Sequence, residues 1–76
     1  MFLEILTPDK TLFSGEVIGV KLPGSKGSFE VLKRHASIVS RLDAGKIRVK
    51  TGQGVEVFEI QGGVIQMMDD KVVVLA

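Results

Sequence analysis

The sequence predicts an all-β fold, and three observations support this prediction. Several short segments have the composition, or the alternation of apolar and polar residues, that is typical of β-strands. Turn-forming residues separate these segments and recur about every eight to ten residues, a spacing typical of a β-sandwich or barrel. Nine glycines among 76 residues also disfavour long helices, because each glycine in a helix interior costs up to about 1 kcal/mol relative to alanine.

Two kinds of sequence pattern, composition and alternation, indicate the expected strands. Residues 2–7 and 71–75 are rich in β-branched and aliphatic side chains. Residues 46–50 alternate strictly between polar and apolar, as a half-buried strand does, and residues 18–22 and 55–57 place an apolar side chain at every second position. We therefore expect strands in these five segments.

Turn signals lie between and beside the expected strands. They are Pro8-Asp9, Ser14-Gly15, Pro23-Gly24, Ala44-Gly45, Gly52-Gln53-Gly54, Gly62-Gly63 and Asp69-Asp70. The best candidate for a helix is residues 32–40, within which residues 33–36 are long enough for a single turn.

Length and composition indicate one soluble, cytoplasmic domain spanning residues 1–76. A chain of this size buries about 60% of the surface that its unfolded form exposes, so it has room for one modest core. The absence of cysteine and the single histidine disfavour zinc and iron–sulfur sites, and we expect no cofactor. The longest apolar run, residues 72–76, is far shorter than the roughly 20 residues that cross a bilayer, and the first residues do not have the features of a signal peptide.

Charge is unevenly distributed along the chain, although its net value is only +1. Residues 21–50 hold eight Lys or Arg against two acidic residues, whereas residues 1–20 and 51–76 carry net charges of −2 and −3. One interpretation is a solvated face that its neighbours balance after folding. The other is a surface that docks on something anionic.

Catalytic chemistry has little support in the sequence. His35 is the one side chain whose ordinary pKa suits proton transfer near neutrality, and Ser37 and Ser40 are its nearest serines, but no Gly-x-Ser-x-Gly elbow exposes a nucleophile. We interpret His35 as a loop or cap residue that makes a structural or interface hydrogen bond. We interpret Asp69-Asp70 as carboxylates that stabilise a turn. The protein is therefore expected to be non-catalytic.

Two other classes of small β-domain were considered. A nucleic-acid-binding module of the OB or SH3 type accounts for the basic segment, but such modules stack bases on aromatic side chains, and this chain has no Trp or Tyr and four scattered Phe. A lipoyl or biotinyl carrier presents a lysine at a hairpin near mid-chain. The comparable lysine, Lys71, lies near the C-terminal end and lacks the usual flanking motif.

Five segments, in order along the chain, are similar to the epsilon subunit of F-type ATP synthases, which is called delta in mitochondria. Residues 22–32, followed by His35-Ala36, resemble the family pattern LPGxxGxFGVLPGHAP. The remaining segments resemble FSGEV, LxPGx[IV]x[IV], GGFxEV and NxVTVLA, and they are residues 13–17, 42–49, 62–66 and 71–76. The match as a whole runs from about residue 2 to residue 76.

The long motif departs from the family pattern at several positions. Glu30 replaces the glycine that usually follows Phe, Lys33-Arg34 replaces Pro-Gly, and Ser37 replaces proline. Ser28 stands where many members have an acidic residue. The loop is consequently more basic than the family pattern.

The resemblance implies a flattened β-sandwich of about ten short strands, with no active site and no cofactor. It implies a rotor subunit of the central stalk that binds the gamma subunit and the c-ring and couples proton translocation to ATP synthesis, without binding nucleic acid. The loop that faces the c-ring aligns with Ser25, Lys26, Gly27, Ser28, Phe29 and Glu30, and further interface residues are Lys33, Arg34 and His35. The basic segment is expected to help seat the domain on the ring or on the membrane surface. Gamma is expected to bind an apolar patch on one sheet, and the sequence does not choose which sheet.

The resemblance also sets an expectation about location and length. The protein is expected to be peripheral, at the cytoplasmic face of the bacterial inner membrane. Typical bacterial members continue after the VLA segment into a two-helix hairpin, which the 76 residues do not include. On this basis the chain is expected to take part in coupling without hairpin-type inhibition of ATP hydrolysis.

Overall fold

A computed structural model describes residues 1–31 and 37–76, and these residues form nine strands and no helix. The all-β prediction is confirmed, with nine strands where about ten were expected. None of the described segments is a helix long and apolar enough to cross a membrane. The strands are β1 (Phe2–Leu6), β2 (Thr11–Glu16), β3 (Gly19–Gly24), β4 (Gly27–Val31), β5 (Ile38–Leu42), β6 (Gly45–Thr51), β7 (Gly54–Ile60), β8 (Gly63–Met68) and β9 (Lys71–Leu75).

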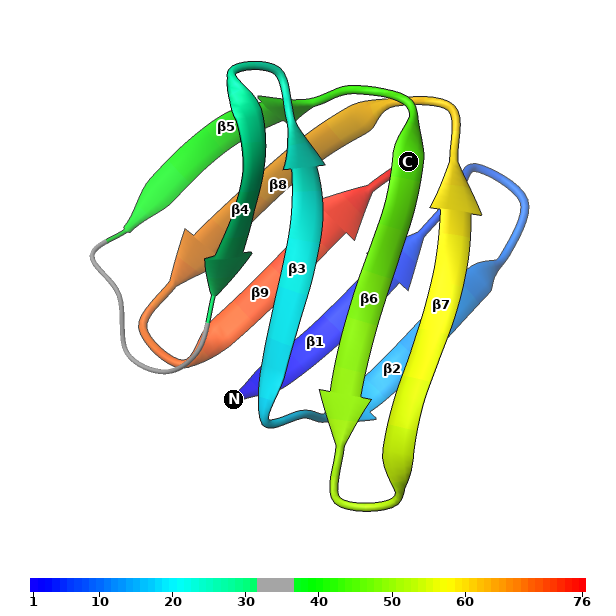
Figure 1. Ribbon diagram of the computed structural model, residues 1–76, viewed down its shortest axis with the longest axis vertical. Helices are drawn as coiled ribbons and strands as arrows, with labels where there is room; N and C mark the ends of the chain where they lie inside the picture. The colour runs from blue at the N-terminus through cyan, green and yellow to red at the C-terminus, as the bar shows by residue number, and fades with distance from the viewer. Residues whose placement is uncertain (32–36) are drawn as a thin grey trace.

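The strands form one hydrogen-bonded path that folds into two packed layers (Figure 1). The path runs β2-β1-β9-β8-β5-β3-β6-β7, and β4 pairs with β3 beside it. Strands β3 and β5 share a single register pair, Gly24 with Leu42, so the sheet bends at this point. We call β4-β3-β6-β7 the front sheet and β5-β8-β9-β1-β2 the rear sheet. Among the described strands, all pairings are antiparallel except that of β1 with β9.

The core lies between the two sheets and is made by alternate residues of nearly every strand. Leu22 of β3 and Ile47 of β6, from the front sheet, and Ile65 of β8, from the rear sheet, have no exposed surface. No polar or charged side chain is buried among the described residues. The buried side chains are Leu3, Ile5, Val17, Val20, Leu22, Val31, Leu42, Ile47, Val49, Ile60, Ile65, Met67, Val72 and Val74.

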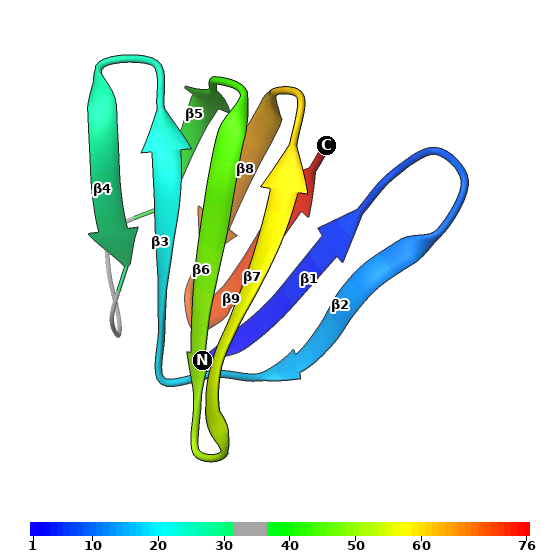
Figure 2. The ribbon, with the colours of Figure 1, turned by 45° about the vertical axis from the view of Figure 1, so that its right-hand side comes forward.

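The two ends of the strand path, β2 and β7, meet through an aromatic contact. The rings of Phe13 and Phe58 lie edge to face, with centroids 5.8 Å apart and planes at 66°. Such pairs contribute about 0.5–1.5 kcal/mol beyond their buried area. Figure 2 shows that the turn of the β1–β2 hairpin leans away from the front sheet. The contact between Phe13 and Phe58 therefore helps to hold β2 against β7.

The five expected strands are confirmed as β1, β3, β6, β7 and β9. Two expected turns are wrong, because Ser14-Gly15 lies inside β2 and Pro23-Gly24 ends β3. Gly15 stands opposite Leu3 in the β1–β2 pairing, and a Cβ there would make only an ordinary contact with the Phe13 ring, at 3.8 Å. Of the expected helical segment, Ile38–Ser40 lies in β5, and residues 32–36 are outside the described part of the chain.

The β3–β4 turn is tied to its neighbours by backbone hydrogen bonds. The Ser25 amide donates to the Arg41 carbonyl at 3.3 Å, and the Asp43 amide donates to the Pro23 carbonyl at 2.7 Å. Gly24 sits at the centre of this junction, where a Cβ would lie 2.7 Å from both the Phe29 ring and the Gly27 carbonyl oxygen. Glycine is therefore required here for close packing.

We predict that Gly24→Ala lowers the free energy of unfolding by about 1–3 kcal/mol, the usual cost of overpacking. The matched control is Gly52→Ala, because a Cβ at Gly52 meets nothing within 4 Å. The control is expected to be neutral or to stabilise by up to about 1 kcal/mol, since alanine restricts the unfolded chain. Urea unfolding measures both, and equal stability of the two variants would contradict the packing role of Gly24.

Candidate interaction surfaces

The predicted c-ring loop is a β-hairpin rather than a free loop. Ser25 and Lys26 form its turn and are exposed, and Gly27 begins β4 with a φ of 117° that glycine adopts readily. Ser28 is exposed and faces away from the core, so the structure brings these four residues together at one end of the sandwich. We call residues 25–28 the hairpin tip.

Two further residues predicted for this interface, Phe29 and Glu30, do not lie at the hairpin tip. Phe29 stands opposite Leu22 on the inner side of the front sheet and packs against the core. Glu30 is exposed on the outer side, opposite Lys21, toward the other end of β4. Lys33, Arg34 and His35 lie outside the described residues.

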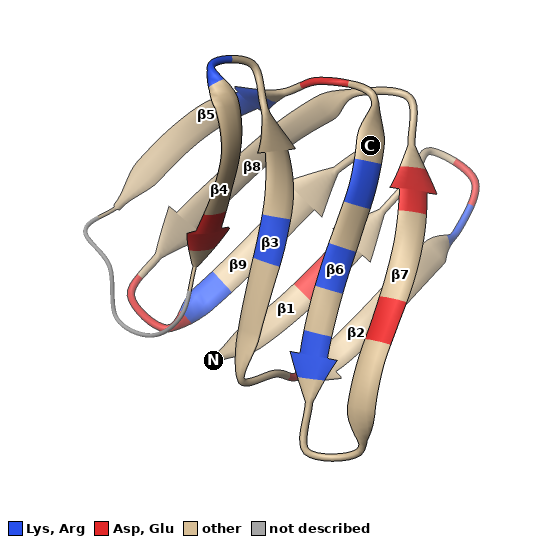
Figure 3. Ribbon diagram, in the orientation of Figure 1, with Lys and Arg blue, Asp and Glu red and all other residues tan. Residues whose placement is uncertain are grey.

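The two central strands of the front sheet, β3 and β6, carry Lys and Arg, and β4 and β7 beside them carry Glu (Figure 3). Strand alternation turns Ile47 and Val49 of β6 into the core, so the residues between and beside them face outward. The register pairs Lys21 of β3 directly with Arg48 of β6. We call this surface the basic face, and its cations are Lys21, Lys46, Arg48 and Lys50.

The basic segment of the sequence is therefore divided by the fold. Four of its eight cations lie on the basic face, Lys26 is at the hairpin tip, and Arg41 projects from the rear sheet beside Val64. The other two cations are outside the described residues. The sequence shows these cations as one segment and does not show that they lie on different surfaces.

The outer side of the rear sheet is largely apolar. Register pairing places the side chains that face away from the core together across β5, β8, β9 and β1. Leu6 and Val73 are half-buried there, and four more apolar side chains are exposed. The exposed ones are Val39 at 72%, Met68 at 54%, Leu75 at 51% and Val64 at 39%. Exposed polar side chains lie among them, namely Arg41, Gln66 and Lys71. We call this surface the apolar face.

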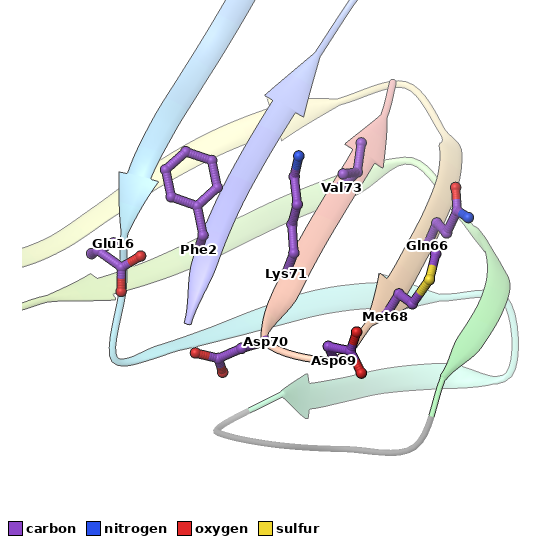
Figure 4. A pocket seen from close by; sticks show the side chains of 8 residues that line it. All are labelled: Phe2, Glu16, Gln66, Met68, Asp69, Asp70, Lys71 and Val73. Carbon is purple, nitrogen blue, oxygen red and sulfur yellow. The ribbon is translucent and has the colours of Figure 1, made fainter.

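A groove of about 570 Å³ runs along one end of the apolar face (Figure 4). Phe2, Met68 and Val73 supply its apolar lining, and the Nζ atom of Lys71 lies 5.9 Å from the centre of the Phe2 ring. The same Nζ atom is 3.3 Å from Oε1 of Glu4. The groove thus combines apolar surface with charged groups at its margin.

The acidic margin of the groove comes from the β8–β9 turn and the end of β2. Asp69 and Asp70 form the turn, as the sequence predicted, and Asp69 has a left-handed φ of 55°, which aspartate tolerates better than most residues. Glu16 and Asp70 lie 3.3 and 3.5 Å from the α-amino group of Met1. The carboxylates of Glu16 and Asp70 are therefore both paired with this amino group. Among the described residues, no group of three or more His, Cys, Asp or Glu is arranged to hold a metal ion.

The apolar patch expected on one sheet was not assigned to a particular sheet from the sequence, although a signal for its position was present. Residues 72–75 are apolar without interruption, whereas a strand with one solvated side alternates. Val72 and Val74 enter the core, which leaves Val73 and Leu75 on the outer side. A strand that is apolar on both sides indicates that its second side also packs against something.

Comparison with known proteins gives a consistent result over the whole chain. A sequence profile described as the β-sandwich domain of the ATP synthase delta/epsilon chain matches residues 1–76. The chain is 43% identical over 74 residues to the ATP synthase epsilon chain of Sulfurimonas denitrificans, covering 96% of this chain and 57% of that protein. It is 40% identical over 76 residues to the epsilon chain of Caulobacter vibrioides, covering all of this chain and 88% of that protein.

Solved structures share the fold at lower sequence identity. A chain in the Euglena gracilis mitochondrial ATP synthase, solved as OSCP, F1 and c-ring, superposes with a TM-score of 0.89 at 23% identity, covering 97% of this chain and 48% of that one. A chain in the Tetrahymena thermophila mitochondrial ATP synthase, solved as central stalk and c-ring, gives 0.79 at 14% identity, covering 99% of this chain and 63% of that one. This chain thus spans about half the length of the Euglena protein.

We predict that the apolar face contributes little to folding. The double variant Val39→Gln, Met68→Gln should keep its free energy of unfolding within about 0.5 kcal/mol, as exposed substitutions usually do. Ile65→Ala, on the inner side of the same sheet, should lose about 2–5 kcal/mol because it leaves a cavity. Urea unfolding compares them, and a large loss in the double variant would mean that the apolar face is part of the folding core.

Proposed function

Because this chain belongs to the β-sandwich family of ATP synthase delta/epsilon chains, we propose that it acts as a non-catalytic subunit of the rotor. It binds the gamma subunit and the c-ring in the central stalk and couples proton translocation to ATP synthesis. It is peripheral, at the cytoplasmic face of the bacterial inner membrane, which the bacterial origin of the named epsilon chains supports. The family match favours this function over a nucleic-acid module or a lipoyl carrier.

The observation that carries the proposal is the apolar face, which we assign to gamma. Val64 stands opposite Leu75, and Leu75 opposite Leu6, so apolar side chains meet across β8, β9 and β1. Val39 adds an exposed apolar side chain on β5, and exposed apolar surface of this kind is typical of protein interfaces. The groove beside Phe2 extends this surface and offers a recess for a side chain. The basic face, with four cations, is a poorer match for a stable subunit contact, because charged residues are depleted at the centre of interfaces.

The hairpin tip is assigned to the c-ring. It is exposed and polar, and hydrogen bonds from Ser25 and Asp43 fix it to the body of the sandwich. A fixed tip can pass a tangential force into the two sheets without bending first. Lys26 gives the tip a positive charge that suits an anionic surface nearby.

Residues 1–76 constitute one β-sandwich domain in this proposal. The core includes side chains from Leu3 near the start to Val74 near the end, and both contribute to the same cluster. A single core that draws on the whole chain supports cooperative folding as one unit.

We predict that Val39→Glu, Met68→Glu lowers co-purification with the cognate gamma subunit at least about tenfold, because two charges would be desolvated at the contact. The matched control is Val55→Glu, Val57→Glu, which adds the same charge to exposed valines of the front sheet. The control should bind gamma as the unmodified chain does. A wild-type chain that fails to bind gamma would refute the proposed function, and selective loss in the control would reverse the assignment of the face.

We predict that Lys26→Glu weakens association with the membrane sector more at low than at high ionic strength, because salt screens exposed charges. Reconstitution of stripped membranes with gamma and the variant, followed by sedimentation at two salt concentrations, measures this. Lys10→Glu, in the exposed β1–β2 turn, serves as the control. An equal loss at both salt concentrations would contradict an electrostatic role for the tip.

A further inference from the structure

The cations of the basic face are not equally paired with carboxylates. Lys46 of β6 stands opposite Glu59 of β7, so that register pair is matched in charge. Two and four residues further along β6, Arg48 and Lys50 stand opposite valines instead, and no ion pair joins either to a described carboxylate. One strand therefore places one cation opposite a carboxylate and two cations opposite apolar residues.

The other neighbour of these cations adds positive charge. On the β3 side, Arg48 stands directly opposite Lys21, which itself has Glu30 on its far side. Directly opposed side chains have Cβ atoms about 4.5–5.5 Å apart, and like charges at that separation destabilise a sheet. An anion between Lys21, Arg48 and Lys50 would remove this repulsion.

A hollow lies where these cations meet. Gly19 stands opposite Lys50 and has no side chain, so the surface is recessed between neighbouring long side chains. The recess has a volume of about 130 Å³, which is small enough to suit a single anionic group. Its lining includes Gly19, Lys21, Glu30, Arg48, Lys50 and Val55.

We propose that this hollow binds a phosphate group, with Arg48 and Lys50 as its principal ligands and Lys21 as a third. The guanidinium of Arg48 suits paired phosphate oxygens, and Lys50 adds a compact charge. Glu30 stands opposite Lys21 and partly neutralises its charge. Arg48 and Lys50 therefore supply most of the positive charge at the hollow. The site lies on the front sheet, away from the apolar face, so it is separate from the surface assigned to gamma.

Titration of the ¹⁵N-labelled chain tests the site in solution. Sodium pyrophosphate is added at ionic strength held constant with sodium chloride, and amide shifts are followed. Saturable shifts should centre on Gly19, Lys21, Arg48 and Lys50. The variant Arg48→Gln, Lys50→Gln should bind pyrophosphate about 25-fold more weakly, because each lost charge lowers the affinity roughly fivefold.

The control variant is Lys46→Gln, Lys26→Gln, which loses the same charge but leaves the hollow intact. It should retain affinity within about twofold, since Lys46 has Glu59 opposite it and Lys26 lies at the hairpin tip, and neither lines the hollow. Both variants should keep the dispersed spectrum of the folded chain. An equal loss in both variants would show that net charge and not the hollow attracts the anion, and would overturn the proposal.

A second arm distinguishes the source of the phosphate. Co-sedimentation of the chain with phosphatidylglycerol vesicles is compared with phosphatidylcholine vesicles, using the same two variants. Binding to phosphatidylglycerol that needs Arg48 and Lys50 identifies a lipid headgroup, whereas response to pyrophosphate alone identifies a soluble phosphate. No response to either probe would refute the site. Because the isolated chain is measured, this failure would leave the proposal for gamma unaffected.

Discussion

The burial of one side of nearly every strand between two packed sheets is the constraint on which the rest of the structure depends. The core is wholly apolar among the described residues and draws on strands from both sheets. Since successive side chains of a strand point to opposite sides, each strand that supplies the core also supplies an outer surface. The character of the two outer surfaces is therefore free to differ, and Lys46, Arg48 and Lys50 on one contrast with Val39, Val64 and Leu75 on the other.

This division explains how a domain of 76 residues can offer several contacts. A small chain cannot spare core residues for binding, because it buries a modest share of its surface. The apolar face, the basic face and the hairpin tip all consist of residues that folding does not require to be apolar or charged. The bend at Gly24 and Leu42 joins the sheets next to the tip, so a force on the tip reaches both layers.

Strand alternation and turn residues were enough to predict the fold class and five strands. Strands β2, β4 and β8 were missed because glycines at their ends or inside them resemble turns, and β5 was missed because Ser40 and Arg41 interrupt its apolar pattern. The basic segment was visible in the sequence, but its division between two sheets depends on register between distant strands. An apolar patch was expected, but its sheet was not identified for the same reason, since Val39 and Val64 belong to strands 20 or more residues apart.

In the proposed complex, gamma contacts the rear sheet and does not contact the front sheet. Methyl-labelled valines test this arrangement directly, because exposed valines occur on both surfaces. On addition of unlabelled gamma, the methyl signals of Val39 and Val64 should shift or broaden, while those of Val55 and Val57 should remain unchanged. Perturbation of Val55 and Val57, with Val39 and Val64 unaffected, would contradict this arrangement.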